Sequence, residues 1–224
     1  MLELKGIAYD LVHVLPGNQR VHMRIAGFRS GTVPGLKIDG RKIQGSTNIA
    51  RELDAVVPEP ALYPHDAVAR REVEDAERWG DTEFQNVPRH ILRWALMKDS
   101  GLRKWFAETD GSMPLPGVAS KLTGPVAIYY ARAVGANEAQ VRKDIAQLPQ
   151  HLDRIDELFA QKVLTRDPPN AATFQLLCSV RALLGFTDFE QEVGARSFAL
   201  LARDLFPHFP PQKVPPFVER LGLA

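Results

Sequence analysis

Residues 31–54 have the sequence GTVPGLKIDGRKIQGSTNIARELD, which contains the clearest local signals in the chain. Apolar and polar residues alternate in residues 36–38 and again in residues 41–43. The Asp39-Gly40 dipeptide between these runs tolerates the positive φ angles of a two-residue type I′ turn. The segment therefore predicts a β-hairpin.

A helix is expected directly after the hairpin. Ser46 is a preferred N-cap residue, and Ile49, Leu53 and Val56 then recur at the spacing of one helical face. Prolines at positions 58 and 60 end this helix, because proline removes a backbone donor and disfavours helix in the residue before it. Upstream of the hairpin, residues 11–14 (LVHV) predict a short strand, and a loop or irregular helix follows through Arg29.

After Pro64 the strand signals disappear and helical patterns follow one another to residue 206. Asp66 is a candidate N-cap for the first of them, and Asn170 is a candidate N-cap for a later one. The predicted helical ranges are 67–84, 91–97 beyond an interruption at Pro88, 118–134, 141–159, 171–184 and 193–206. We therefore expect an α/β plus all-α chain, with a small α/β domain at 1–57, a linker at 58–65 and an all-helical domain at 66–224.

Composition excludes several classes of partner. Lys and Arg number 28 against 27 Asp and Glu, so the net charge is +1 and indicates neither nucleic acid nor an anionic membrane. No apolar run approaches the roughly 20 residues that cross a bilayer, and the start lacks the apolar stretch of a secretory signal. A single cysteine fits a reducing compartment, so we expect a cytoplasmic protein. The six histidines show no metal-ligand spacing, and no metal site is predicted.

Four segments resemble, in order, parts of the cytosolic-type glutathione S-transferases. They are LELKGIAYDLVHV (2–14), GTVPGLKIDGRKIQGSTNIARELD (31–54), EPALYPHDAVARREVEDAERWGD (59–81) and PPNAATFQLLCSVRALLGF (168–186). The resemblance implies a thioredoxin-like domain followed by an all-helical domain. In the family a first strand and most of a first helix, about twenty residues, precede the match to residue 2. It therefore implies that the small domain is incomplete here and is weakened or rearranged.

The resemblance also implies a glutathione site at Val33, Pro34, Gly45 and Ser46. Val33 and Pro34 match the cis-proline turn whose backbone pairs with the cysteinyl backbone of glutathione, although a proline at a strand start is ordinarily trans. Ser46 matches the residue that receives the γ-glutamyl carboxylate, and a helix N-terminus attracts carboxylates even where its residue is a plain cap. Gly45 stands where the family has an acidic residue or glutamine that meets the amino group. Gln44, one place away, is expected to point to the other face of the strand.

No catalytic residue is assigned. The family activates the thiol with a Tyr, Ser or Cys near the end of the first strand, and that segment is missing here. Tyr9 matches the entry to the second strand, which favours a structural role. Cys178 lies mid-helix among Leu176, Leu177 and Val180, which predicts a buried core thiol.

The leading expectation is a glutathione S-transferase-like protein that, in a full-length form, conjugates glutathione to an apolar electrophile in detoxification. Glutathione is then the cosubstrate, and the family implies a homodimer. One alternative is a non-catalytic binding or scaffolding protein, favoured by Gly45 and the missing strand. Another is a different glutathione-dependent enzyme, such as a peroxidase, dehalogenase or isomerase.

Overall fold

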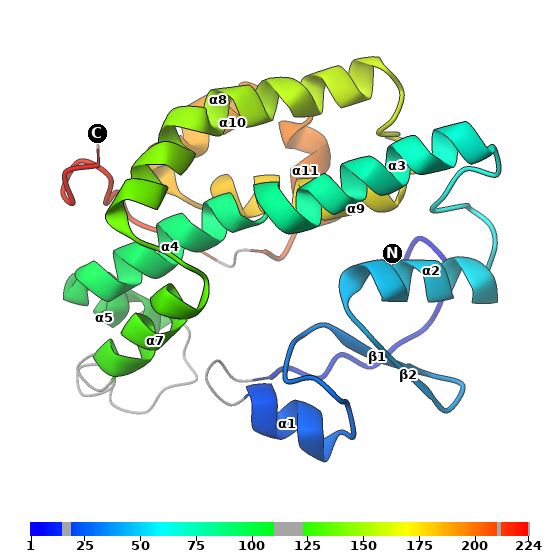
Figure 1. Cartoon of the computed structure of the whole chain (residues 1–224), viewed down its shortest axis with the longest axis horizontal. Helices are drawn as coiled ribbons and strands as arrows, with labels where there is room; N and C mark the ends of the chain where they lie inside the picture. Colours follow the sequence, from blue (N-terminus) through cyan, green and yellow to red (C-terminus); the bar gives the residue numbers. More distant parts are fainter. Residues whose placement is uncertain (15–18, 110–122, 210–211, 224) are drawn as a thin grey trace. The chain divides into compact units, whose positions relative to one another are not determined.

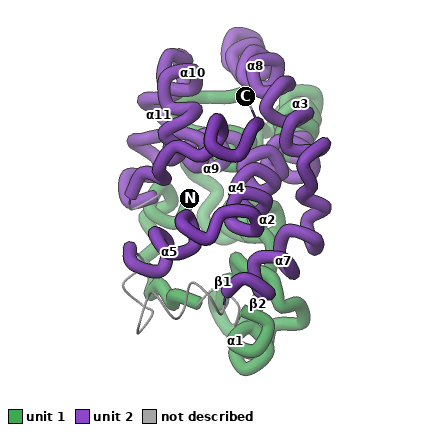
Figure 2. The backbone as a smooth tube through the Cα atoms, turned by 90° about the vertical axis from the view of Figure 1, so that its left-hand side faces the viewer, with its two compact units in different colours: residues 1–77, 163–175 green, residues 78–162, 176–224 purple. Residues whose placement is uncertain are grey.

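The computed structural model describes residues 1–14, 19–109, 123–209 and 212–223. The chain divides into two compact units, residues 1–77 with 163–175 and residues 78–162 with 176–224 (Figure 2). Two of the three unit boundaries fall inside continuous helices, α3 (Ala67–Trp79) and α9 (Ala171–Leu183). The predicted domain division into 1–57, 58–65 and 66–224 stays a prediction, because a compact unit of the structure need not coincide with a domain.

The predicted hairpin is confirmed in the first unit. Strands β1 (Gly35–Ile38) and β2 (Arg41–Gln44) pair antiparallel, with Leu36 opposite Ile43 (Figure 1). The φ angles of Asp39 and Gly40 are 47° and 75°, both positive as a type I′ turn requires. The short helix α1 (Gln19–Ile25) precedes the hairpin, and its Met23 is buried.

Helix α2 (Ser46–Val56) follows β2 directly and packs against it. Ile49, Ala50 and Leu53 are its buried residues, so the predicted apolar face is turned inward. The helix ends before Pro58, as expected from the loss of a donor at proline. The chain then passes through a segment in which the Glu59–Pro60 peptide is cis.

The predicted strand at residues 11–14 is wrong. Within the described part of the chain the only sheet is the two-stranded hairpin, so this segment has no neighbouring strand to bond. Its Leu11 and Val12 side chains are exposed. The first residues do have the geometry of a helix end: Gly6 N–H donates to Glu3 O, Ile7 N–H donates to Leu2 O, and Gly6 has a φ of 66°. This pairing is a Schellman motif.

The helical remainder begins with α3, whose N-terminus is capped as predicted. Asp66 Oδ1 accepts hydrogen bonds from the backbone N–H groups of Val68 (3.0 Å) and Ala69 (2.9 Å). The expected interruption at Pro88 is displaced upstream. Pro88 lies in the first turn of α4 (Asn86–Lys98), where a missing N–H is tolerated, and a π-helical turn, η1 (Gly80–Phe84), joins α3 to α4.

Helix α4 is central to the second unit, where it contacts both α7 (Gly124–Ala133) and α8 (Glu138–Ala160). The helix predicted at 141–159 is confirmed within α8, where Val141, Leu148, Leu152 and Ile155 are fully buried. The first residues of the predicted 118–134 helix lie outside the described residues. The remaining elements are α5 (Ser100–Thr109), η2 (Thr187–Phe189), α10 (Glu190–Gly194) and α11 (Ala199–Leu205).

The single helix predicted at 193–206 is wrong, because the chain turns between α10 and α11. In this turn Arg196 forms ion pairs with Asp153 and Asp156 of α8, and Ser197 Oγ donates to Asp156. Phe198 is completely buried. These contacts with a distant helix outweigh the helical propensity of the segment.

Helix α9 begins as predicted at the Asn170 cap. Asn170 Oδ1 accepts from the backbone N–H of Thr173 (3.0 Å) and also from the Thr173 hydroxyl (3.0 Å). The same hydroxyl is 2.9 Å from Thr165 O, so it ties the cap to the preceding turn. The helix continues without interruption from this cap to Leu183.

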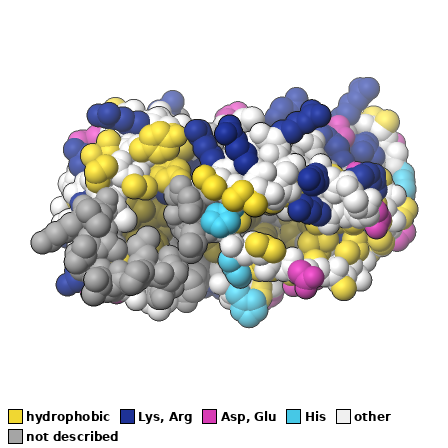
Figure 3. Space-filling model, turned by 90° about the horizontal axis from the view of Figure 1, so that it is seen from below, with side chains coloured by type: hydrophobic (Ala, Val, Ile, Leu, Met, Phe, Trp, Pro, Cys, Tyr) yellow, Lys and Arg dark blue, Asp and Glu magenta, His cyan; other side chains and the backbone are white. Residues whose placement is uncertain are grey.

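No helix in the described ranges is long and apolar enough to cross a membrane. Lys and Arg side chains lie in several separate groups on the face drawn in Figure 3, interspersed with hydrophobic side chains.

Candidate functional site

The loop before β1 is held by the side chain of Gln44. Gln44 Oε1 accepts from Ser30 N–H (3.0 Å), and Gln44 Nε2 donates to Ser30 O (2.8 Å) and Thr32 O (2.7 Å). These three bonds use both ends of the amide. Gln44 therefore positions residues 30–32 and is not available to a ligand, a role that its sequence position did not reveal.

Val33 and Pro34 follow this loop and lie beside the start of α2. The Val33–Pro34 peptide is cis, and Pro34 O accepts a hydrogen bond from Gly45 N–H (3.0 Å). Val33 is 50% exposed. Its backbone N–H and C=O have no hydrogen-bond partner among the residues that the structure describes. The four predicted site residues, Val33, Pro34, Gly45 and Ser46, therefore lie close together. Val33 contributes a free backbone N–H donor and a free C=O acceptor to this group.

The start of α2 differs from the prediction in one respect. Gly45, not Ser46, is the N-cap residue, and Ser46 is the first residue of the helix. Gly45 has φ 90° and ψ 141°, a conformation essentially limited to glycine. The chain needs this conformation to enter α2, and Gly45 therefore occupies the N-cap position.

The first turn of α2 leaves backbone donors free. The first backbone bond at this end runs from Ile49 N–H to Gly45 O (3.0 Å). No side chain caps the helix, and the N–H groups of Ser46, Thr47 and Asn48 have no acceptor in the described part of the chain. Free N–H groups and the positive end of the helix dipole together form a site for a carboxylate or another anion.

Comparison with known protein families identifies the first part of the chain. Residues 1–61 match the family model described as the N-terminal domain of glutathione S-transferase. These residues form a glutathione S-transferase N-terminal domain. Searches of curated proteins and of solved structures found no match to the chain. With its small sheet and helical remainder, the chain has a thioredoxin-like domain followed by a helical part, as predicted.

Lys5 fixes the end of the glutathione S-transferase N-terminal domain, and sequence reasoning missed it. Its Nζ lies 2.7 Å from Asp54 Oδ1 and 2.7 Å from the backbone oxygens of Val57 and Pro60. Asp54 also accepts from the N–H of Leu62 (2.7 Å). A lysine beside apolar residues in sequence carries no signal of these partners, which lie about fifty positions away.

Two side chains weighed as possible activating groups have other partners. Tyr9 donates its hydroxyl to Glu3 Oε1 (3.0 Å), and this bond raises the pKa of Tyr9. Cys178, predicted to be a buried core thiol, is exposed on α9, so that prediction is wrong. Its neighbours Leu176, Leu177 and Val180 occupy the buried face, which leaves the thiol on the other side of the helix. Desolvation by the surrounding protein nevertheless raises the pKa of Cys178, which keeps the thiol protonated at neutral pH and makes it a weak nucleophile.

Within the described ranges, no three or more His, Cys, Asp or Glu side chains are grouped as metal ligands. The groups of the glutathione S-transferase N-terminal domain that are free to bind a ligand are the backbone donors of α2, the exposed Val33 and the Ser46 hydroxyl.

Replacing Gln44 with alanine is expected to loosen residues 30–32, because three hydrogen bonds to the loop are lost. Each such bond contributes about 1 kcal/mol, so unfolding should become easier by about 1–3 kcal/mol. Hydrogen exchange of the loop amides measures the local effect. Arg41 lies on the same strand and makes none of these bonds. An Arg41→Ala variant with equally fast exchange in the loop would contradict the role of Gln44.

Proposed function

We propose that the glutathione S-transferase N-terminal domain binds glutathione at Val33, Pro34, Gly45 and Ser46. The single observation that carries this proposal is the free donor set at the start of α2, beside the unpaired backbone of Val33. The γ-glutamyl carboxylate is placed on the N–H groups and the Ser46 hydroxyl. The cysteinyl part, an extended peptide, pairs with the N–H and C=O of Val33 in the manner of an added strand.

The amino group of glutathione has no evident partner at this place. Gly45 has no side chain, and the Gln44 amide is used by Ser30 and Thr32. In this proposal affinity therefore depends on the carboxylate and on the backbone of Val33. A ligand that keeps the carboxylate and lacks the amino group, such as the desamino analogue of glutathione, should bind with little loss.

We further propose that the protein is a cytoplasmic transferase that joins the glutathione thiol to an apolar electrophile. This step rests on the family of residues 1–61. Turnover of chlorodinitrobenzene tests it, since the thiolate displaces chloride and the product absorbs light. A homodimer, expected from the same family, is tested by the mass of the protein in solution.

Replacing Ser46 with alanine should weaken glutathione binding about tenfold, because the ligand carboxylate loses one charge-assisted hydrogen bond. Isothermal titration calorimetry on the whole chain measures the dissociation constant. Ser100→Ala is the matched control, since Ser100 is also the first residue of a helix, α5, in the second unit. The control variant should bind like the unmodified protein.

Each result has a definite meaning. Equal affinity of Ser46→Ala and the unmodified protein would contradict the carboxylate site. Tight, Ser46-dependent binding without turnover of any electrophile would instead support the non-catalytic binding protein.

A further inference from the structure

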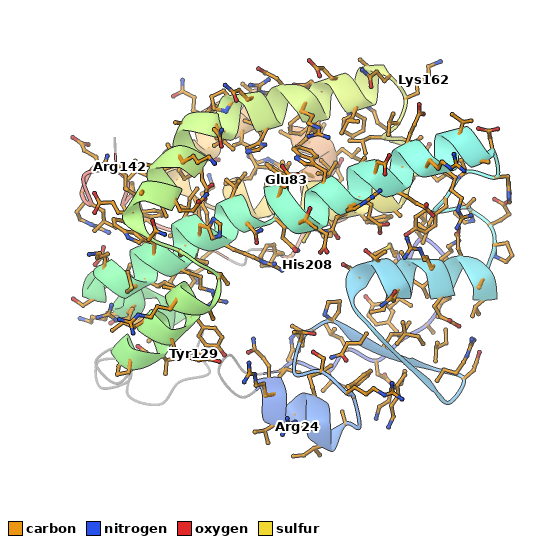
Figure 4. The ribbon with its side chains drawn as sticks, viewed as in Figure 1. Arg24, Glu83, Tyr129, Arg142, Lys162 and His208 are labelled. Atoms are coloured by element: carbon orange, nitrogen blue, oxygen red, sulfur yellow. The ribbon has the colours of Figure 1, made fainter. Side chains whose placement is uncertain are left out.

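Helix α1 presents apolar side chains to solvent on the side opposite its buried residue. Met23 is buried, whereas Val21 and Ile25 are 54% and 81% exposed. A residue two positions along a helix is turned by about 200°, so Val21 and Ile25 both lie opposite Met23. Arg20 and Arg24, which Figure 4 labels on α1, are exposed and each precede one of the two apolar residues. The outward face of α1 is therefore apolar and bordered by cations.

The hairpin turns one of its two faces toward α1. Met23 and Phe28 pack directly on Gly35, since a Cβ at this position would lie 2.6 Å from Met23 Cε and 2.9 Å from Phe28 Cζ. Residues two apart in a strand point to the same side, so Lys37 is on the α1 side of β1. Lys42 is directly opposite Lys37 in the register and shares this side. Figure 1 and Figure 2 both show the hairpin between α2 and α1.

Lys37 and Lys42 form a like-charged pair on this side. Both are exposed, and Lys42 Nζ lies against the backbone of Gly27, just beyond the end of α1. Like charges directly opposite each other on two strands are destabilising. Neither lysine, nor Arg20 or Arg24, forms an ion pair with any residue that the structure describes. The pair therefore weakens the hairpin instead of stabilising it.

Charge is unevenly distributed along the chain. Residues 19–44 contain six Lys and Arg and one acidic residue, so their net charge is +5 against +1 for the whole chain. The six are Arg20, Arg24, Arg29, Lys37, Arg41 and Lys42. The net charge of the whole chain thus conceals a basic region. Its exposed part formed by Arg20, Val21, Arg24, Ile25, Lys37 and Lys42 is called the α1 face below.

We propose that the α1 face docks on an anionic lipid bilayer. Outward apolar side chains bordered by Lys and Arg are typical of helices that lie in a membrane interface. There the apolar groups enter the acyl boundary and the cations meet lipid phosphates. A nucleic acid would accept the cations, but its phosphate backbone offers no apolar layer to Val21 and Ile25. This inference goes beyond the proposed function, because it does not depend on bound glutathione.

Two apolar side chains give only a weak, reversible attachment, so the cations have to contribute to it. Co-sedimentation of the whole chain with vesicles tests this. Vesicles of phosphatidylcholine alone are compared with vesicles of an equimolar mixture of phosphatidylcholine and phosphatidylglycerol. We expect binding to the mixed vesicles that weakens as salt is raised, because salt screens the charges. Equal binding to both kinds of vesicle, or binding to neither, would overturn the proposal.

Two double variants separate the contributions of charge and apolar contact. Lys37→Gln with Lys42→Gln should weaken binding to the mixed vesicles about tenfold or more, since each cation near the surface adds to the attraction. Val21→Gln with Ile25→Gln should weaken it about tenfold, because less apolar surface leaves water. Glutamine is a good helix former, so α1 itself is not weakened.

The matched controls are Arg71→Gln and Val68→Gln, both at exposed positions of α3 in the same unit. They should bind the mixed vesicles like the unmodified protein, and a control that loses binding equally would contradict the α1 face. Binding that needs the two lysines but neither Val21 nor Ile25 would assign a polyanion such as nucleic acid and overturn the lipid proposal.

The melting temperature without vesicles separates binding from structure. Both double variants change exposed side chains, and one of them relieves the repulsion between Lys37 and Lys42. Each should therefore melt at the temperature of the unmodified protein or slightly higher. A clearly lower melting temperature would show that the replaced side chains have a structural role and would overturn the proposal.

Discussion

Replacement of Lys5 by alanine is expected to lower the free energy of unfolding of the first unit by about 3–5 kcal/mol, the usual effect of removing one partner of a buried ion pair. The Lys5 side chain is completely buried and that of Asp54 is 17% exposed. The ammonium group satisfies Asp54 and the backbone oxygens of Val57 and Pro60 at the same time. Its loss leaves a carboxylate and these oxygens short of donors in a place that water scarcely reaches.

The measurement must report on the first unit. The three tryptophans, Trp79, Trp94 and Trp105, all lie in the second unit, so their fluorescence does not report on the first. Hydrogen exchange of the α2 amides in increasing urea is suitable, because α2 ends at the Lys5 contacts. Lys37→Ala is the matched control, since Lys37 is an exposed lysine of β1 in the same unit. A loss below about 1 kcal/mol for Lys5→Ala, the range of exposed ion pairs, would contradict the buried role.

Replacement of His90 by alanine is expected to destabilise the second unit by a similar amount, about 3–5 kcal/mol. His90 Nδ1 lies 2.7 Å from Asp144 Oδ2, and His90 Nε2 lies 2.9 Å from Val134 O. The side chains of His90 and Asp144 are only 11% and 8% exposed. Because a carbonyl oxygen only accepts, Nε2 must donate to it. His90 thus joins α4 to α8 and to the end of α7.

Without His90, the carboxylate of Asp144 keeps only the bond from Gln140 Nε2 (2.7 Å) among the residues that the structure describes. Urea unfolding followed by tryptophan fluorescence measures the effect, since Trp94 is buried on the same helix as His90. His208→Ala is the control, because His208 is an exposed histidine of the same unit, labelled in Figure 4. Equal stability of the two variants would show that the His90 bonds add nothing to the fold.

The sequence predicted the parts of the fold that depend on neighbouring residues. The Asp39-Gly40 turn needs only two residues that accept positive φ, and the hairpin follows from it. The Asp66 and Asn170 caps need only a side-chain oxygen within three positions of free N–H groups. The helix predicted at 141–159 needs only helical periodicity.

The glutathione site stays a prediction. Resemblance indicated Val33, Pro34, Gly45 and Ser46, and the structure places them side by side. It also corrects their roles, since the cap is Gly45 and Ser46 opens the helix. The side chain of Gln44 turns back to Ser30 and Thr32, which strand alternation could not foresee because the partners lie in an irregular loop.

By itself, then, the sequence determined the turns, the caps, the helical periods and the family of residues 1–61, because each is a property of adjacent residues or of a matched pattern. Tertiary structure alone decided that residues 11–14 form no strand and that Arg196 and Ser197 break the last helix. It also decided the partners of Lys5, 49 to 55 positions away, and of His90, 44 and 54 positions away. A strand needs a neighbour and a buried charge needs a counter-charge, and only folding brings such distant groups within hydrogen-bonding distance.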